Sequence, residues 1–126
     1  MTKRRRKWLV AGLVIAALLI GIAVPVYKTA IRSSREKTLR ANLHTLRSVI
    51  GQYTADKRGA PQTLQDLVDA GYFRKLPLDP VTNSNSTWEP VMATVVISPG
   101  KTGHGIVDVH SGSNSTSSDK TPYRSW

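Results

Sequence analysis

The longest uninterrupted apolar stretch of the chain lies near its start. Residues 8–26, WLVAGLVIAALLIGIAVPV, contain no charged side chain. At 1.5 Å per residue, a helix of this length spans about 28 Å, close to the thickness of about 30 Å of the hydrocarbon layer of a bilayer. We therefore predict a transmembrane helix over residues 8–26. A cleaved secretory signal is the alternative, because a basic segment precedes the run and Gly21-Ile22-Ala23 offers small residues for cleavage.

Apolar side chains recur with a helical period after Pro25. Steps of four and three residues place them on one face of a helix, and most charged side chains of the segment fall off that face. We predict an amphipathic stem helix over residues 28–58 that ends at Gly59, with a bend or interruption at Pro25, which lacks a backbone donor. The apolar face should pack against protein, including other membrane proteins or copies of the chain. The stripe consists of Leu39, Leu43, Leu46, Ile50 and Tyr53.

A second and shorter helical pattern follows the stem. Thr63 and Asp66 have the spacing of a helix-capping pair, and Gly71 is a stop signal. We therefore predict a short helix over residues 63–70. The proline-rich segment 72–80 after it is unsuited to regular structure.

The last third of the chain has the pattern of a hairpin and a loop. Residues 91–98 are rich in β-branched side chains, residues 99–103 form turns readily, and residues 105–110 read as a second strand. We predict a β-hairpin over about residues 91–110. A C-terminal loop, 111–126, should follow, docked through Trp126.

These elements together predict an α+β fold, in which a long N-terminal helix packs on a small antiparallel β-sheet. The helix would combine the transmembrane part with the amphipathic stem. We expect residues 1–7 to form a cytoplasmic basic tail, because cytoplasmic flanks are enriched in Lys and Arg. Residues 27–126 would then form an extracytoplasmic domain.

The charge of the chain is concentrated on both sides of the apolar run. Residues 1–27 carry five cations and no acid, residues 28–58 carry eight cations and two acids, and residues 59–126 carry five cations and six acids. Lys and Arg side chains near anionic lipid gain about 1 kcal/mol each, so this distribution favours membrane lipid over nucleic acid as a partner. A solvated helix face is the alternative. The predicted membrane-surface contacts are Arg32, Arg35, Lys37 and Arg40.

The side-chain chemistry argues against catalysis. The chain has no cysteine, which excludes disulfides and thiolate metal sites. No serine, histidine and acid arrangement, glycine-rich phosphate loop or pair of supported carboxylates is evident. We therefore expect no enzyme activity and no small-molecule substrate. Asp108 and His110 share a strand face, for which an ordinary solvated surface is favoured over a transition-metal site.

Several separate segments of the chain together resemble one known family. They are residues 25–27, 32–40, 46–53, 60–67, 71–74, 77–80 and 105–113, with the continuation to Trp126. These segments resemble the type IV pilin-like family, and most closely the major (G-type) pseudopilin of type II secretion. The similarity covers about residues 24–126, and the matching segments occur in the order of the family.

The resemblance implies a non-enzymatic structural subunit. In that family the helix N-terminus lies in the inner membrane, and subunits stack helix against helix into a short periplasmic filament. The family's processing motif has a glycine, then usually a phenylalanine, with a glutamate four positions after that residue. Alignment on Pro25 places Lys3, Arg4 and Trp8 at these positions, and none matches. A non-polymerising, permanently anchored accessory subunit of a larger membrane complex is therefore the alternative.

The resemblance also implies a possible calcium site in the C-terminal loop. Calcium takes six to eight oxygen ligands, usually several of them carboxylates. The candidate ligands here are Asp119 and Asn114, with Asp108 nearby. A loop closed by hydrogen bonds is the alternative.

Overall fold

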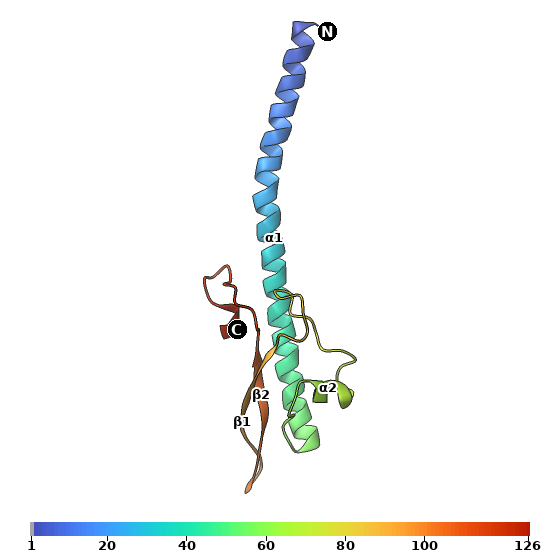
Figure 1. The fold of residues 1–126 in the computed structure, drawn as a ribbon, viewed down its shortest axis with the longest axis vertical. Coiled ribbons are helices and arrows are strands. Elements are labelled where there is room, and N and C mark those ends of the chain that lie inside the picture. Colours follow the sequence, from blue (N-terminus) through green and yellow to red (C-terminus); the bar gives the residue numbers. More distant parts are fainter. Residues whose placement is uncertain (1) are drawn as a thin grey trace. The chain divides into compact units, whose positions relative to one another are not determined.

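The computed structural model describes residues 2–126. It divides into two compact units, with the boundary between Ser34 and Arg35, and each unit is considered by itself. The elements are one long helix, one short helix and a two-stranded antiparallel sheet, so the predicted α+β class is confirmed (Figure 1).

The long helix α1, Lys3–Lys57, is continuous in both units. The predicted interruption at Pro25 is wrong, because proline removes only one backbone donor and the helix continues through it. The main-chain oxygen of Pro25 also accepts a hydrogen bond from Thr29 Oγ1 at 3.0 Å. At the other end, the helix stops at Lys57, close to the predicted end at Gly59, and Arg58 adopts the left-handed conformation (φ 50°).

The short helix α2, Gln65–Asp69, is held at its start by the predicted capping pair. Asp66 Oδ2 accepts from the backbone N–H groups of Gln62 and Thr63, and the backbone N–H of Asp66 donates to Thr63 Oγ1 at 3.2 Å. This reciprocal arrangement satisfies donors that a helix start otherwise leaves unpaired. Gly71, at φ 87°, follows the end of the helix.

The hairpin consists of β1, Glu89–Ser98, and β2, Lys101–His110. Glu89 lies opposite His110 and Ser98 opposite Lys101, so the turn is only Pro99-Gly100. The second strand therefore begins four residues earlier than predicted. Pairing with the apolar end of β1 draws residues 101–104 into the sheet although their own sequence lacks strand character.

The hydrophobic core of the Arg35–Trp126 unit lies between α1, the hairpin and the C-terminal segment. The α1 side chains Leu39, Leu43, Leu46 and Ile50 are at most 2% exposed. They belong to one cluster of ten buried residues. The other members are Leu64, Leu67, Trp88, Ile106, Val109 and Tyr123.

The 3₁₀ helix η1, Tyr123–Ser125, ends the described chain. Trp126 packs edge-on against Tyr123, with ring centroids 5.0 Å apart, and its indole Nε1 donates to Thr121 Oγ1 at 2.9 Å. Trp126 is half-buried and is docked on the unit as the sequence predicts.

Candidate functional site

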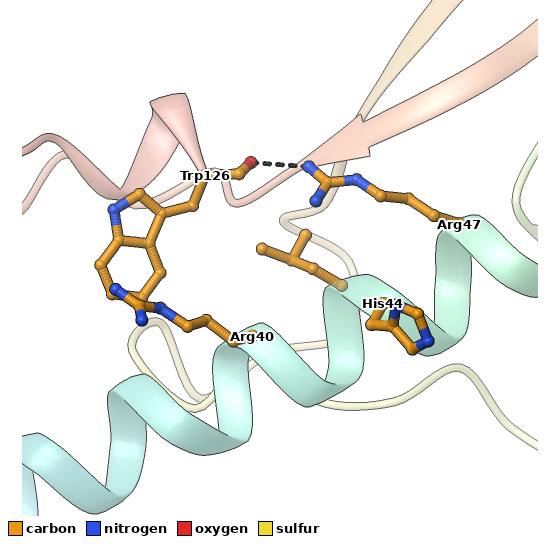
Figure 2. Close-up of a pocket in the computed structure, with 5 residues that line it drawn as sticks. Arg40, His44, Arg47 and Trp126 are labelled. Atoms are coloured by element: carbon orange, nitrogen blue, oxygen red, sulfur yellow. Dashed lines mark hydrogen bonds between the residues drawn. The ribbon is translucent and has the colours of Figure 1, made fainter.

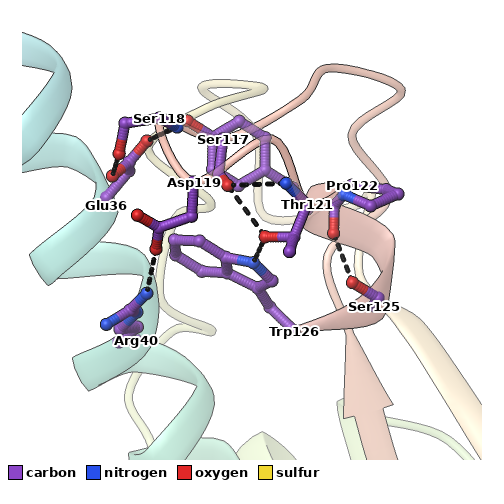
Figure 3. Close-up of polar contacts among 10 residues, drawn as sticks. Glu36, Arg40, Ser117, Ser118, Asp119, Thr121, Pro122, Ser125 and Trp126 are labelled. Carbon is purple, nitrogen blue, oxygen red and sulfur yellow. Dashed lines mark hydrogen bonds and ion pairs between the residues drawn. The ribbon is translucent and has the colours of Figure 1, made fainter.

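Three α1 side chains hold the C-terminal segment against the helix. Glu36, Arg40 and Arg47 all contact residues between positions 108 and 126 (Figures 2 and 3). We call these three side chains and their contacts the C-terminal clasp. The spacings of four and seven residues place the three on neighbouring positions along the helix surface.

Glu36 is the innermost member of the clasp and is only 8% exposed. Its carboxylate accepts from the backbone N–H of Ser118 at 2.8 Å, from the Ser118 hydroxyl at 2.6 Å and from the Tyr123 hydroxyl at 2.9 Å. Three hydrogen bonds from two residues of the C-terminal segment to one buried side chain hold this segment against α1. Figure 3 shows the Ser118 contacts beside the side chains that close the rest of the loop.

Arg47 joins α1 to both β2 and the last residue. Its Nε donates to Asp108 Oδ1 at 2.6 Å, and its Nη2 donates to the main-chain oxygens of Val109 and Trp126 at 2.9 and 2.8 Å. His110 Nδ1 lies 2.5 Å from the same Trp126 oxygen. One guanidinium thus ties together the helix, the strand and the loop.

Partial burial would raise the pKa of the Asp108 carboxyl, but other contacts outweigh it. The Val109 backbone N–H and the Arg47 guanidinium stabilise the ionised form, so the pKa lies below its usual value of 3.8. A carboxyl with a lowered folded pKa contributes stability above its unfolded pKa and loses it as the pH falls through the folded pKa.

The acid sensitivity of the fold should therefore depend on Asp108. We expect Asp108→Asn to lower the melting temperature near neutral pH. As the pH falls from neutral to the lowered pKa of Asp108, the melting temperature of the variant should fall less steeply than that of the parent chain. Melting curves at a series of pH values check this. Parallel curves for the two proteins would contradict it.

Arg40 and Trp126 border a pocket of about 350 Å³, which is also lined by Leu43, His44 and Arg47 (Figure 2). The Arg40 guanidinium lies 4.3 Å from the centroid of the Trp126 ring, a cation–π contact, and 3.5 Å from Asp119 Oδ2. Both side chains of this ion pair are more than 60% exposed, so it contributes little to stability.

The remaining polar anchor is Asp79, which is fully buried in the loop before the hairpin. Its Oδ1 accepts from the backbone N–H of Val81 at 2.9 Å, and its Oδ2 accepts a short hydrogen bond from the Ser111 hydroxyl. Asp79 thus ties the loop after α2 to the start of the C-terminal loop.

The structure does not gather the predicted calcium ligands. Asp119 pairs with Arg40, Asp108 pairs with Arg47, and Asn114 is exposed. Within residues 2–126, no three His, Cys, Asp or Glu side chains lie close enough to hold a metal ion. These donors fit calcium poorly and favour the alternative of a loop closed by hydrogen bonds.

We therefore expect melting of the full-length chain to be insensitive to calcium. Scans with excess calcium and with a chelator should give the same midpoint, because Glu36 already closes the loop. A midpoint that rises with calcium would instead establish an ion in the loop.

The predicted apolar stripe faces the chain's own core. Its first four members pack there, and Tyr53 is half-buried against the same cluster. The apolar stripe is thus buried by other residues of the same chain. Packing of α1 against other membrane proteins or copies of the chain, which was predicted for this stripe, stays a prediction.

The four predicted membrane-surface cations are all exposed on α1. Arg40 also takes part in the clasp, a role that the sequence analysis did not assign. The burial of Glu36 was not predicted either, although the sequence contains a signal for it. Glu36 lies three residues before Leu39, in phase with the apolar stripe, which indicates a buried acid.

Within the described residues, α1 contains the one helix segment that is long and apolar enough to cross a membrane. The side chains of that segment are exposed in the chain. This is consistent with single-pass membrane anchoring. Comparisons with protein-family models, curated proteins and solved structures gave no match to this chain.

Proposed function

We propose that the protein is a membrane-anchored, non-enzymatic structural subunit of the pseudopilin-like class, similar to a filament subunit of type II secretion. The observation that carries the proposal is that the apolar side chains of α1 are exposed in its first part and buried in its second part. Residues 8–26 offer an exposed apolar surface in the described part of the chain, whereas the side chains of Leu39, Leu43, Leu46 and Ile50 are buried in a small folded unit. A helix built this way suits a subunit that is held in lipid and carries a folded head.

The clasp supports a structural role over a catalytic one. Asp108 and Arg47 bind each other, and Glu36 accepts hydrogen bonds from hydroxyl and backbone donors. Carboxylates fixed in this way are poor proton carriers, because a general acid or base must exchange its proton with a reacting group. The Arg47–Asp108 ion pair and the hydrogen bonds of Glu36 hold the C-terminal segment against α1.

The second candidate is a permanently anchored accessory subunit that does not polymerise. The residues at the family's processing positions, Lys3, Arg4 and Trp8, favour it. Burying unpaired positive charge among packed helices of a filament is costly, so a chain that retains these cations is hard to assemble into one.

Overexpression in membranes followed by electron microscopy separates the two candidates. Filaments that contain the chain would support the filament subunit. A stoichiometric complex recovered in mild detergent, with residues 3–8 still present by mass spectrometry, would support the accessory subunit. A chain that is monomeric in detergent and forms neither filaments nor complexes would contradict both.

A contact with lipid phosphates is part of the same proposal. Arg35 and Lys37 are exposed on α1 and contribute no ion pair to the clasp. We expect Arg35→Glu with Lys37→Glu to weaken binding of the chain to anionic vesicles, while the melting temperature changes little. Arg74→Glu with Lys75→Glu, which reverses two exposed cations after α2, is the matched control, and equal loss in both double variants would contradict the assignment.

A further inference from the structure

The outer edge of the hairpin has main-chain groups without a partner. Strand β1 pairs with β2 on one side only, and within residues 2–126 its main chain makes no backbone hydrogen bond to any other segment. A ten-residue edge strand in this state is a template for another strand.

The contacts of β2 show which groups point outward. The backbone N–H of Ile106 donates to the main-chain oxygen of Pro61 at 2.8 Å, and therefore points away from β1. In an antiparallel ladder, residues directly opposite each other either exchange hydrogen bonds or both point away. Met92 lies opposite Ile106, so the main-chain groups of Met92 face the free edge. Alternation along the strand assigns Thr94 and Val96 to the same edge.

Pro90 agrees with this assignment, because proline is tolerated in a sheet only where its nitrogen faces away from the ladder. The register is irregular between Val91 and Met92 and again between Val96 and Ser98. The regular part of the edge is therefore Met92–Val96, which offers three donors and three acceptors. We call this segment the free edge.

Charge, a common device that protects an edge strand, is absent from the free edge, whereas Pro90 and the two irregularities of register lie at or beyond its ends. No charged side chain occurs between Pro90 and Ser98, although lysine and inward-pointing charges are the common means of discouraging pairing. Met92 is 43% exposed and Val96 is 74% exposed. Apolar side chains beside unpaired backbone groups suit a strand that carries β-branched or apolar residues opposite them.

We propose that the free edge binds an extended, uncharged segment of a partner protein, which adds an antiparallel third strand to the sheet beside β1. Main-chain hydrogen bonds would supply most of the affinity, and contacts with Met92 and Val96 would select apolar side chains. The lack of charge on the edge means that acidic or basic segments gain nothing from binding there and lose hydration.

A second copy of the chain fits this edge less well. The hairpin lies alongside the part of α1 that begins at Arg35, in the same unit (Figure 1). Two-fold antiparallel pairing of β1 with β1 would place the Arg35 ends of the two helices at opposite ends of the dimer. Two chains anchored in one bilayer need these ends on the same side. The preference for a partner protein over a second copy rests on the proposed membrane anchor. The observation that the edge is exposed does not depend on that anchor.

A tethered probe tests the proposal in the full-length chain. The chain has no cysteine, so Ser98→Cys gives a single attachment point at the end of the free edge. The probe is a capped Thr-Val-Thr-Val-Thr peptide, joined through a cysteine and a short glycine spacer, which gives an effective concentration in the millimolar range. Hydrogen exchange of the backbone amides is then measured in detergent micelles.

We expect the amides of Met92, Thr94 and Val96 to exchange at least about tenfold more slowly with the probe attached. The control peptide carries prolines at its three central positions and should give no protection. Absence of protection with the first peptide, or equal protection with both, would overturn the proposal. Protection in the untethered chain that rises with protein concentration, together with dimers in sedimentation, would assign the edge to a second copy and would also overturn it.

Discussion

Replacing Glu36 by alanine is expected to lower the free energy of unfolding of the Arg35–Trp126 unit by about 2 to 4 kcal/mol. The substitution removes the acceptor of the Tyr123 hydroxyl, which is buried, and of the backbone N–H and hydroxyl of Ser118, whose hydrogen bonds to Glu36 are part-buried. Buried donors without an acceptor cost the full penalty of their lost hydration. Denaturant unfolding of the full-length chain in detergent, followed by tryptophan fluorescence, gives the value.

Two variants make this result specific to the clasp. Glu36→Gln retains one carbonyl acceptor and should lose only part of the stability. Lys37→Ala, at the next and exposed position, should change the stability by less than about 0.5 kcal/mol. A Glu36→Ala protein as stable as the Lys37→Ala protein would contradict the role assigned to the buried carboxylate.

Replacing Gly112 by alanine is expected to cost about 3 kcal/mol. A Cβ atom at this position would lie 1.9 Å from the main-chain oxygen of Thr87, a separation that neither backbone can accept without moving. The loop before β1 and the loop after β2 approach each other through this glycine. Their displacement would also disturb the Ser111 contact with Asp79.

Gly51→Ala is the matched control, because a Cβ atom there meets nothing within 4 Å. Gly51 lies on the exposed face of α1, where alanine is the better helix former, so this variant should gain about 1 kcal/mol. The two glycine substitutions should therefore change the stability in opposite directions. Equal effects would show that the close approach of Gly112 to Thr87 does not constrain the fold.

Local patterns in the sequence were sufficient for most of the elements. The steps of four and three residues predicted the buried face of α1, and the spacing of Thr63 and Asp66 predicted the start of α2. The β-branched run predicted β1. These patterns involve residues that are close in the sequence, so they can be recognised without the tertiary structure.

The clasp could not be predicted in the same way. Glu36 contacts Ser118 and Tyr123, which are 82 and 87 residues further along the chain. No local pattern connects such positions. The calcium site was expected only from the family resemblance, and the contact of the Glu36 carboxylate with this loop had no counterpart in that expectation. The start of β2 was missed because its first residues are recruited by their pairing with β1.

The membrane anchor is tested most directly by washing membranes of cells that express the full-length chain with alkaline carbonate and then measuring the intact mass of the protein. We predict that the chain stays in the pellet and that its mass includes the apolar residues 8–26. A product released into the supernatant, with a mass that lacks those residues, would contradict the account of a lipid-held structural subunit.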